Sequence, residues 1–201
     1  TGQVRWQATD ELASYASPVI ARLQPPAPPG GDAARGDVDR NGDSPPGGAG
    51  GYRERCFALA RGGLAVLDPA TGKVDFQFPW RAAKLESVNA SSPVVVDDQV
   101  FISEAYGPGA ALLRVKPDGG HEVVWQDQPR SRERSLELHW NTAVHDAGHL
   151  YVAESSGSND PVEQQLEEKP HRIVRLTDTD GDGRYDERVV FADKMMFPEG
   201  T

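Results

Sequence analysis

The sequence predicts an all-β protein whose short antiparallel strands repeat as four-stranded units, and three observations lead to this prediction. The pattern Thr-Gly-x-Val-x-(Trp/Phe) occurs twice, at residues 1–6 and 71–76. Each copy is followed by a strand start of the form Ser-Pro-Val, at residues 17–19 and 92–94. Short apolar runs alternate with turns rich in Gly, Pro and Asp and show no helical period, which is typical of repeated β-sheets.

The composition supports many short strands and excludes several classes of function. Only 37% of the 201 residues are hydrophobic, while 21 Gly and 16 Pro provide material for turns. The net charge of −10 argues against nucleic acid or an anionic membrane as a partner. Cys56 is the single cysteine, so no disulfide can form within the chain and no cysteine-based metal cluster is possible. No apolar run approaches the ~18–20 residues that would span a bilayer.

The first strand is expected within residues 14–23, where Pro18 opens an apolar run. Residues 24–51 follow, half of them Pro or Gly, and they predict a disordered insert because they cannot bury enough apolar surface to offset their ordering entropy. Further strands are then expected in close succession. They lie at residues 56–61 and 64–68, which form a hairpin around Gly62-Gly63, and at 74–78, 93–96, 100–103, 112–115, 122–125 and 150–152.

A third, degenerate copy of the repeat occupies residues 117–125 and is followed by a strand start at residues 141–144. Residues 82–88 and 130–138 tolerate a helix but are interpreted as loops. The sequence then changes character, because residues 154–170 form a polar linker. A hairpin follows, with strands at residues 173–176 and 188–192 on either side of an acidic turn. The expected segments are therefore 1–23, 24–51, 52–153, 154–170 and 171–201.

The repeated pattern favours a β-propeller, in which each four-stranded sheet is one blade. Its glycine lets the chain reverse tightly, and the following aromatic ring can wedge between neighbouring blades, contributing ~2–3 kcal/mol. The alternative is that Trp6, Phe76 and Trp125 are unrelated core residues of a β-sandwich. The predicted fold is a partial, open propeller of about three four-stranded blades plus a C-terminal hairpin. That is too few blades to close a ring.

Residues 1–23 and 52–152 resemble the pyrroloquinoline quinone (PQQ)-type repeat, through the Thr-Gly-x-Val-x-Trp and Ser-Pro-Val-Val-Val motifs and the stretches at 61–80, 87–113 and 138–142. That repeat builds the propellers of quinoprotein alcohol dehydrogenases and of an outer-membrane assembly lipoprotein. The resemblance implies an exported, periplasmic protein of bacterial type. It also implies PQQ as a cofactor if the chain is enzymatic.

The C-terminal segment resembles a second family. Residues 169–201 look like the opening blade of a bacterial glucose-dehydrogenase-like propeller, whose members are described as membrane-bound dehydrogenases. The two resemblances meet near residue 154, which suggests a hybrid or a fragment of two propeller families.

Residues 178–186 carry the strongest candidate for ligand chemistry. They match the first nine positions of an EF-hand-type calcium loop, in which alternate carboxylates wrap the ion and a glycine allows the sharp turn. The twelfth position is Val189, so the bidentate glutamate is missing. The alternative is an Asp/Gly-rich turn without an ion. The predicted ligands are Asp178, Asp180, Asp182, the carbonyl of Arg184, and Asp186.

Two other groups are weaker metal candidates. Residues 37–43 repeat the first ligand types of the calcium loop, but Pro45 stands where the ninth ligand would be. His139, His145 and His149 lie close together in sequence, yet the expected turn at residues 146–148 separates the last two. Structural histidines are the favoured interpretation.

A quinoprotein dehydrogenase needs a tryptophan floor, a carboxylate base and calcium beside the quinone. Trp80 and Trp140 are the candidates for stacking, although packing between blades is the favoured role. Glu86 and Glu104 are expected near loops that connect blades, and nothing in the sequence marks either as a base.

The sequence therefore favours a non-catalytic, calcium-stabilised binding or scaffold module whose partner is another protein or further blades. The rival interpretation is part of a PQQ-dependent alcohol or sugar dehydrogenase. A fragment without independent function is a third possibility. The catalytic and quinone-binding residues stay unassigned.

Overall fold

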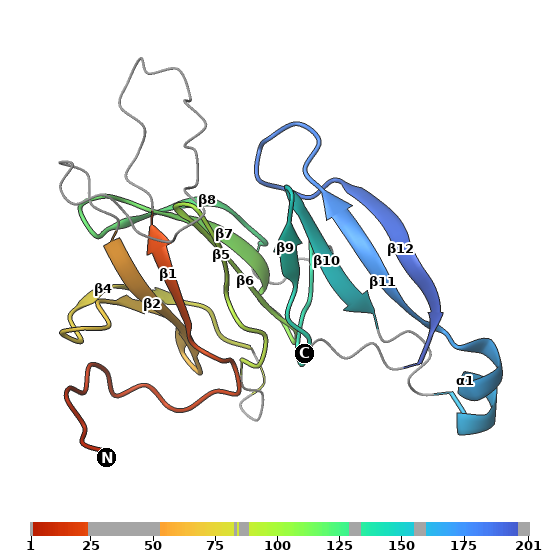
Figure 1. Ribbon diagram of the computed structural model, residues 1–201, viewed down its shortest axis with the longest axis horizontal. Coiled ribbons are helices and arrows are strands. Elements are labelled where there is room, and N and C mark those ends of the chain that lie inside the picture. Colours follow the sequence, from red (N-terminus) through yellow and green to blue (C-terminus); the bar gives the residue numbers. More distant parts are fainter. Residues whose placement is uncertain are drawn as a thin grey trace, which may run out of the picture.

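The computed structural model describes residues 2–23, 53–82, 84, 89–128, 134–154 and 160–196. These residues form three four-stranded antiparallel sheets, and in each sheet the four strands follow one another along the chain (Figure 1). The prediction of an all-β fold with four-stranded units is confirmed. The first sheet contains β1 (Val19–Leu23), β2 (Arg53–Ala60), β3 (Gly63–Leu67) and β4 (Val74–Pro79).

The other two sheets repeat this order. The second contains β5 (Val94–Val96), β6 (Gln99–Glu104), β7 (Gly109–Val115) and β8 (His121–Gln126). The third contains β9 (Val144–Asp146), β10 (His149–Glu154), β11 (His171–Thr177) and β12 (Glu187–Met195).

The C-terminal hairpin differs from its prediction in one respect. It is not an addition to three earlier sheets, because β11 pairs with β10 over residues 172–177 and 149–154. The hairpin therefore completes the third sheet and joins residues on both sides of the expected boundary near residue 154. This association depends on hydrogen bonds between β10 and β11. The polar sequence between the two strands gives no sign that they pair.

Residues 160–170 contain a helix that the polar-linker interpretation did not include. Helix α1 (Val162–Glu168) begins after Pro161 and ends at Lys169, which adopts a left-handed conformation with φ 47° and whose N–H bonds to the carbonyl of Gln165. Gln165 is buried, and its side-chain amide donates to the carbonyl of Asp160 at 2.6 Å. No helix in the described ranges has the length and hydropathy needed to cross a membrane.

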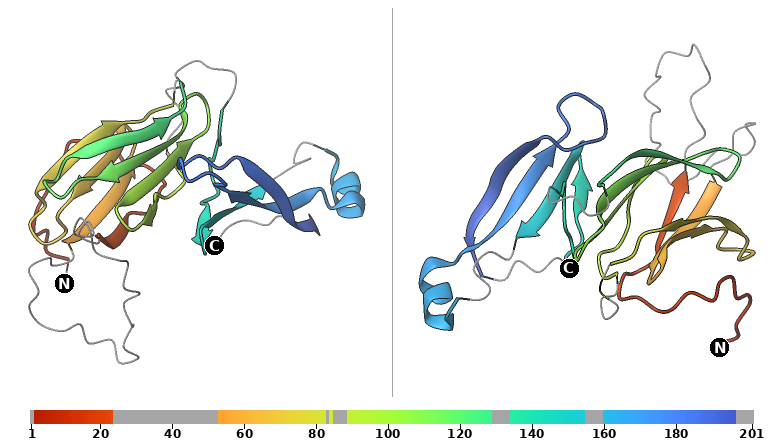
Figure 2. Two further views of the ribbon diagram at one scale, coloured as in Figure 1. Left: turned by 90° about the horizontal axis from the view of Figure 1, so that it is seen from above. Right: turned by 180° about the vertical axis from the view of Figure 1, so that it is seen from behind.

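Two apolar cores hold the three sheets together, and the second sheet contributes to both. Between the first and second sheets lie Phe57, Leu59, Leu64, Val66, Val100, Ile102 and Leu113, each no more than 1% exposed. Between the second and third sheets lie Phe101, Leu112, Trp125, Leu138, Leu150, Val152 and Val174. Figure 2 shows the resulting order of sheets, with the second in the middle. This stack of three does not fit a two-sheet sandwich.

A repeated hydrogen bond links equivalent strand starts from sheet to sheet. The backbone N–H of Ser17, before β1, donates to the hydroxyl of Ser92, before β5, at 3.0 Å. The backbone N–H of Ser92 in turn donates to the hydroxyl of Thr142, before β9, at 3.0 Å. The Ser-Pro-Val motif therefore marks the same structural position in successive sheets.

The aromatic residues of the repeat also reach toward the following sheet. Trp6 lies over Gly72, where a Cβ would come within 2.6 Å of the indole, and its Nε1–H donates to the carbonyl of Pro69 at 3.1 Å. Phe76 of the first sheet packs against His121 of the second, with ring centroids 4.4 Å apart. Trp6 therefore meets the turn between β3 and β4, and Phe76 meets His121, the first residue of β8.

Two predictions lie outside the described residues. The Pro/Gly-rich insert at residues 24–51 is one, together with the weak calcium motif at 37–43 inside it. The candidate base Glu86 is the other.

Candidate functional site

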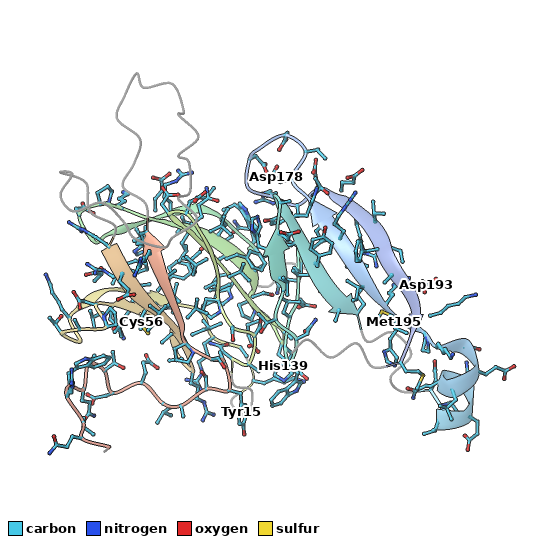
Figure 3. All side chains as sticks on the ribbon, in the orientation of Figure 1. Tyr15, Cys56, His139, Asp178, Asp193 and Met195 are labelled. Carbon is cyan, nitrogen blue, oxygen red and sulfur yellow. The ribbon has the colours of Figure 1, made fainter. Side chains whose placement is uncertain are left out.

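The acidic loop, residues 178–186, connects β11 to β12 at one end of the third sheet (Figure 3, Asp178). Gly181 and Gly183 have φ of 77° and 87°, a left-handed region that residues with a Cβ rarely adopt. The N–H of Asp186 donates to the carbonyl of Thr177 at 3.0 Å and closes the loop. Glycines and backbone closure together turn the chain within a few residues.

Carboxylates of the loop satisfy its own backbone N–H groups. Asp178 accepts from Gly181 N at 2.7 Å and from Gly183 N at 2.8 Å, one bond to each oxygen. Asp182 accepts from the N–H of Arg184 at 2.7 Å, and Asp180 accepts from Asp182 at 3.2 Å. These Asx-type turns curl the backbone so that successive acidic side chains face one centre.

Three of the four predicted carboxylate ligands come together. One oxygen from each of Asp178, Asp180 and Asp182 lies within 4.8 Å of the others. Asp186 is held differently, because it accepts from Thr179 N at 2.9 Å and from the Thr179 hydroxyl at 2.5 Å. Those two bonds hold the pKa of Asp186 below its ordinary value of 3.8. The complete ligand set, including the Arg184 carbonyl, stays a prediction.

The arrangement suits a hard divalent cation. Its donors are carboxylate oxygens alone, which Ca²⁺ prefers. At this spacing, unit charges repel one another by roughly 1 kcal/mol per pair in water, so a cation between them would relieve the repulsion. Val189, at the twelfth position, lies on β12 and has no oxygen in its side chain. Any carboxylate ligand of a cation in this loop must therefore come from the first nine positions.

A tryptophan from the neighbouring sheet packs against the acidic loop. Trp125 of β8 donates from Nε1 to the carbonyl of Gly183 at 2.5 Å. The guanidinium of Arg184 lies 5.3 Å from the centre of the Trp125 ring. A Cβ on Gly183 would come within 2.7 Å of Leu112 Cδ2 and 3.3 Å of Trp125 Nε1. The loop therefore links the candidate ion site directly to the packing of two sheets.

A small cavity of about 80 Å³ lies between the loop and the second sheet. Asp178, Tyr185 and His145 line its polar side, while Phe101 and Leu150 belong to its apolar wall. Burial raises the pKa of Tyr185 above its ordinary value of 10.0, and the charge of Asp178 adds to the rise. The phenol therefore stays neutral and packs against the core as a partly buried ring.

The three histidines do not converge on a metal site in the described residues. His149 Nδ1 lies 3.0 Å from the hydroxyl of Thr177, and His145 lines the cavity. His139 Nδ1 lies 3.9 Å from Glu104 Oε1, and burial lowers the pKa of its imidazole below 6.5. Each of the three histidines therefore has a separate local environment.

The two candidate stacking tryptophans have different surroundings. Trp80 is buried, and its Nε1 donates to the carbonyl of Gly109 at 3.3 Å. Trp140 is 67% exposed and lies 5.1 Å from the Tyr15 ring. Glu104 is fully buried beside His139, whose ring lies 4.9 Å from the ring of Trp140. Figure 3 labels His139 and Tyr15 in this region.

Sequence reasoning missed the contact between Trp125 and the acidic loop. The repeat held a usable signal, because Trp6 reaches the turn between β3 and β4, and Phe76 reaches His121 at the start of β8. The acidic loop is that turn in the third sheet. Applying the same rule to Trp125 would have pointed to residues 178–186.

Comparison with known proteins gives one family match. Residues 132–201 match a protein family described as a domain of unknown function (DUF7133). The match covers the whole third sheet with its acidic loop and helix α1. Neither a curated protein nor a solved structure matched the chain. The matched family is not described as a PQQ-type repeat, so the resemblance of the preceding residues stays a prediction.

Proposed function

We propose that this chain is a propeller-type binding or scaffold module whose sheet packing is stabilised by calcium at the acidic loop. The proposal depends on one observation: carboxylate oxygens of Asp178, Asp180 and Asp182 lie close together on the loop that accepts a hydrogen bond from Trp125. A bound cation would fix the loop and, through Gly183, the contact between the second and third sheets. The module would then present its surfaces to another protein or to further blades.

The propeller interpretation is supported by the way the sheets repeat. Three consecutive four-stranded sheets pack face to face, with equivalent strand starts joined by hydrogen bonds from Ser17 to Ser92 and from Ser92 to Thr142. Equivalent aromatics meet equivalent turns. These are the relations expected of adjacent blades in an open arrangement.

Because the chain resembles exported proteins, we propose that its loop binds calcium with modest affinity. Extracellular calcium modules bind with dissociation constants of about 10⁻⁴–10⁻³ M, which suits a loop without the bidentate glutamate. Such a site is occupied where calcium is abundant. We propose the periplasm or another exported compartment as the location of the chain.

Calcium titration monitored by thermal unfolding tests the proposal. A ligand that binds only the native state stabilises it by about 2.7 kcal/mol at one hundred times its dissociation constant. We expect calcium to raise the melting temperature of the wild type and chelator to reverse the rise. Asp180→Asn should remove the response, whereas Asp10→Asn, which changes an exposed aspartate outside the loop, should keep it. Equal responses in wild type and Asp180→Asn would refute the calcium site.

A quinoprotein dehydrogenase is the second candidate. Trp140 offers a largely exposed indole next to Tyr15, with the buried carboxylate of Glu104 behind His139. A planar cofactor could stack on that indole. Addition of PQQ and calcium, followed by dye reduction with alcohols or sugars, tests this function. Turnover that Trp140→Ala abolishes would favour the enzyme over the scaffold.

A further inference from the structure

Aromatic side chains that belong to all three sheets meet at one end of the stack. Tyr15 precedes β1, Tyr106 lies in the turn between β6 and β7, and His139 and Trp140 precede β9. Because the strands are antiparallel, the start of the first strand of a sheet and the turn between its second and third strands lie at the same end. Figure 3 shows Tyr15 and His139 at the end opposite the acidic loop. We call these four residues the aromatic cluster.

The rings of the aromatic cluster contact one another in succession. The ring centroids of Tyr15 and Trp140 lie 5.1 Å apart, those of Trp140 and His139 4.9 Å, and those of His139 and Tyr106 5.0 Å. The last two contacts are T-shaped, at 66° and 81°, so the rings form angled walls and not a flat stack. Tyr15 and Trp140 are 68% and 67% exposed, and Tyr106 is 45% exposed. Ring surface is therefore open to a ligand.

Backbone hydrogen bonds hold the segments that carry these rings. The N–H of Leu138 donates to the hydroxyl of Ser103, and its carbonyl accepts from the N–H of Ala105, both at 2.9 Å. These bonds fix the segment that leads into β9 against the end of β6. The N–H of Tyr15 donates to the carbonyl of the buried Asn89 at 3.0 Å. The rings are therefore positioned before any ligand binds.

Tyr106 has an unusual backbone conformation. Its φ of 60° lies in the left-handed region, which bulky residues rarely adopt. Such a conformation persists where the surrounding structure imposes it, and it is most frequent at ligand sites and active sites. At this turn it places the ring of Tyr106 against His139.

The chemistry of the aromatic cluster favours a cation. The faces of aromatic rings attract positive charge, and the Nζ of Lys84 already lies 4.8 Å from the centre of the Tyr106 ring. Burial lowers the pKa of His139 below 6.5, so its ring is neutral near pH 7 and adds no competing positive charge. Behind the rings, the carboxyl of Glu104 lies 3.9 Å from Nδ1 of His139. The net charge of the chain, −10, acts in the same direction.

The exposure of the rings determines which kind of cation is suited to them. A primary ammonium group is strongly hydrated, so it gains little when it leaves water for an open ring. A nitrogen that carries methyl groups is weakly hydrated and can lay those groups on aromatic faces, as quaternary ammonium ligands do in aromatic cages. Trp140 offers the best face, because the indole is the strongest of the aromatic partners for a cation.

We propose that the aromatic cluster binds a small quaternary ammonium ion, whose methyl groups contact the rings of Trp140 and Tyr15. Lys84 competes for the adjacent face of Tyr106. Further sheets would pack along the stack and not at its end, so the site is independent of what covers the outer faces of the first and third sheets. It is also independent of calcium, since the acidic loop lies at the opposite end.

Choline and its neutral isostere 3,3-dimethyl-1-butanol, in which carbon replaces the charged nitrogen, test the role of charge. Saturation-transfer NMR, which detects the methyl protons of each ligand, measures their binding directly. We expect saturable binding of choline, and binding of the alcohol that is weaker by about fivefold. Equal binding of the two would show a merely apolar surface and would overturn the proposal. The absence of saturation transfer to choline at about 10 mM would overturn it as well.

Substitutions in the aromatic cluster locate the site. Trp140→Ala should weaken choline binding about fivefold, whereas Trp6→Ala, at a tryptophan outside the cluster, should leave it unchanged. Tyr106→Gly should also weaken binding but keep the melting temperature, because glycine accepts the left-handed φ. Lys84→Met should strengthen choline binding several-fold, since it removes the competing ammonium group. Choline binding that Trp140→Ala does not weaken would refute the assignment to this cluster.

PQQ distinguishes this site from a quinoprotein function that uses the same tryptophan. PQQ carries carboxylate groups, so Lys84→Met should weaken any binding of PQQ to these rings while it strengthens the binding of choline. Weaker binding of both ligands in Lys84→Met would show that the lysine supports the cluster and does not compete for it, and would overturn the proposal. Dye reduction with alcohols or sugars, measured separately, keeps the fate of the enzyme hypothesis distinct from that of the cation site.

Discussion

Trp125 and Gly183 are 58 residues apart in sequence, yet the indole N–H of one donates to the carbonyl of the other at 2.5 Å. The bond joins β8 of the second sheet to the acidic loop of the third. A residue selected for packing and a loop with metal-ligand chemistry therefore share one contact. Stability measurements on either side of this contact should be coupled.

Replacing Gly183 by alanine should destabilise the protein more than the same change at Gly181. Both glycines have positive φ, so both substitutions incur backbone strain of order 1–3 kcal/mol. Only at Gly183 does the new Cβ also collide, at 2.7 Å from Leu112, since the space around Gly181 is open. Urea unfolding of the two variants measures the difference. Equal losses would show that the loop does not support the neighbouring sheet.

Trp125→Phe should cost about 1 kcal/mol beyond any change in packing, because the carbonyl of Gly183 loses its donor. The loss of unfolding free energy should be smaller in a Gly183→Ala background, where the contact between Trp125 and the loop is already disturbed. A double-mutant cycle, followed by urea unfolding, isolates the coupling. Additive losses would place the stabilising effect of Trp125 elsewhere.

Gly72→Ala should release Trp6 from the first sheet. Gly72 has φ 75°, and a Cβ there would lie 2.6 Å from the indole, whereas Gly2 has φ 65° with no atom within 4 Å. Tryptophan fluorescence should shift to the red in Gly72→Ala and stay unchanged in Gly2→Ala. With Trp6 removed by Trp6→Phe, the red shift caused by Gly72→Ala should disappear. If it persists, another tryptophan is reporting.

The stabilising effect of Glu154 should depend on pH. Burial alone would raise the pKa of its carboxyl, but hydrogen bonds from Arg188 and Arg172 outweigh this and hold the pKa below 4.5. A carboxyl with a depressed folded-state pKa stabilises the protein above its unfolded-state pKa and loses that effect as the pH falls through the folded-state value.

Glu154→Gln should therefore lower the melting temperature near neutral pH, by an amount equivalent to about 1 kcal/mol. Wild type and variant should converge as the pH falls below about 4. Glu163→Gln, an exposed glutamate on α1, serves as the control and should show little effect. A difference between Glu154→Gln and wild type that is constant with pH would show that the two arginine contacts do not hold the ionised form.

Local signals in the sequence predicted most strands. The hairpin around Gly62-Gly63 forms as expected, because Gly63 has φ 148° and its missing Cβ admits the carbonyl of Phe78. The short apolar runs before and after Asp97-Asp98 likewise become β5 and β6. In these cases the turn residues and the strands they connect are neighbours in sequence, so the physical cause lies within a short window.

Longer-range relations escaped prediction. The pairing of β10 with β11 crosses residues 155–170, and no periodic pattern spans that interval. Helix α1 was hidden by its polarity, although it consists mainly of the good helix formers Glu, Gln and Leu after a proline. In the acidic loop, spacing predicted that the aspartates lie together, as Asp178, Asp180 and Asp182 do. The position of Asp186 depends instead on its hydrogen bonds to Thr179, which the spacing does not specify.

Leu23 and Arg53 lie opposite each other on β1 and β2, so the chain leaves the first sheet and re-enters it at adjacent positions. The entropy of closing such a connection grows only with the logarithm of its length, about 0.6 kcal/mol for each doubling. The stability of the first sheet should therefore depend only weakly on the number of residues between Leu23 and Arg53. A tag, an epitope or a reporter inserted between these two positions should leave the packing of the sheets undisturbed.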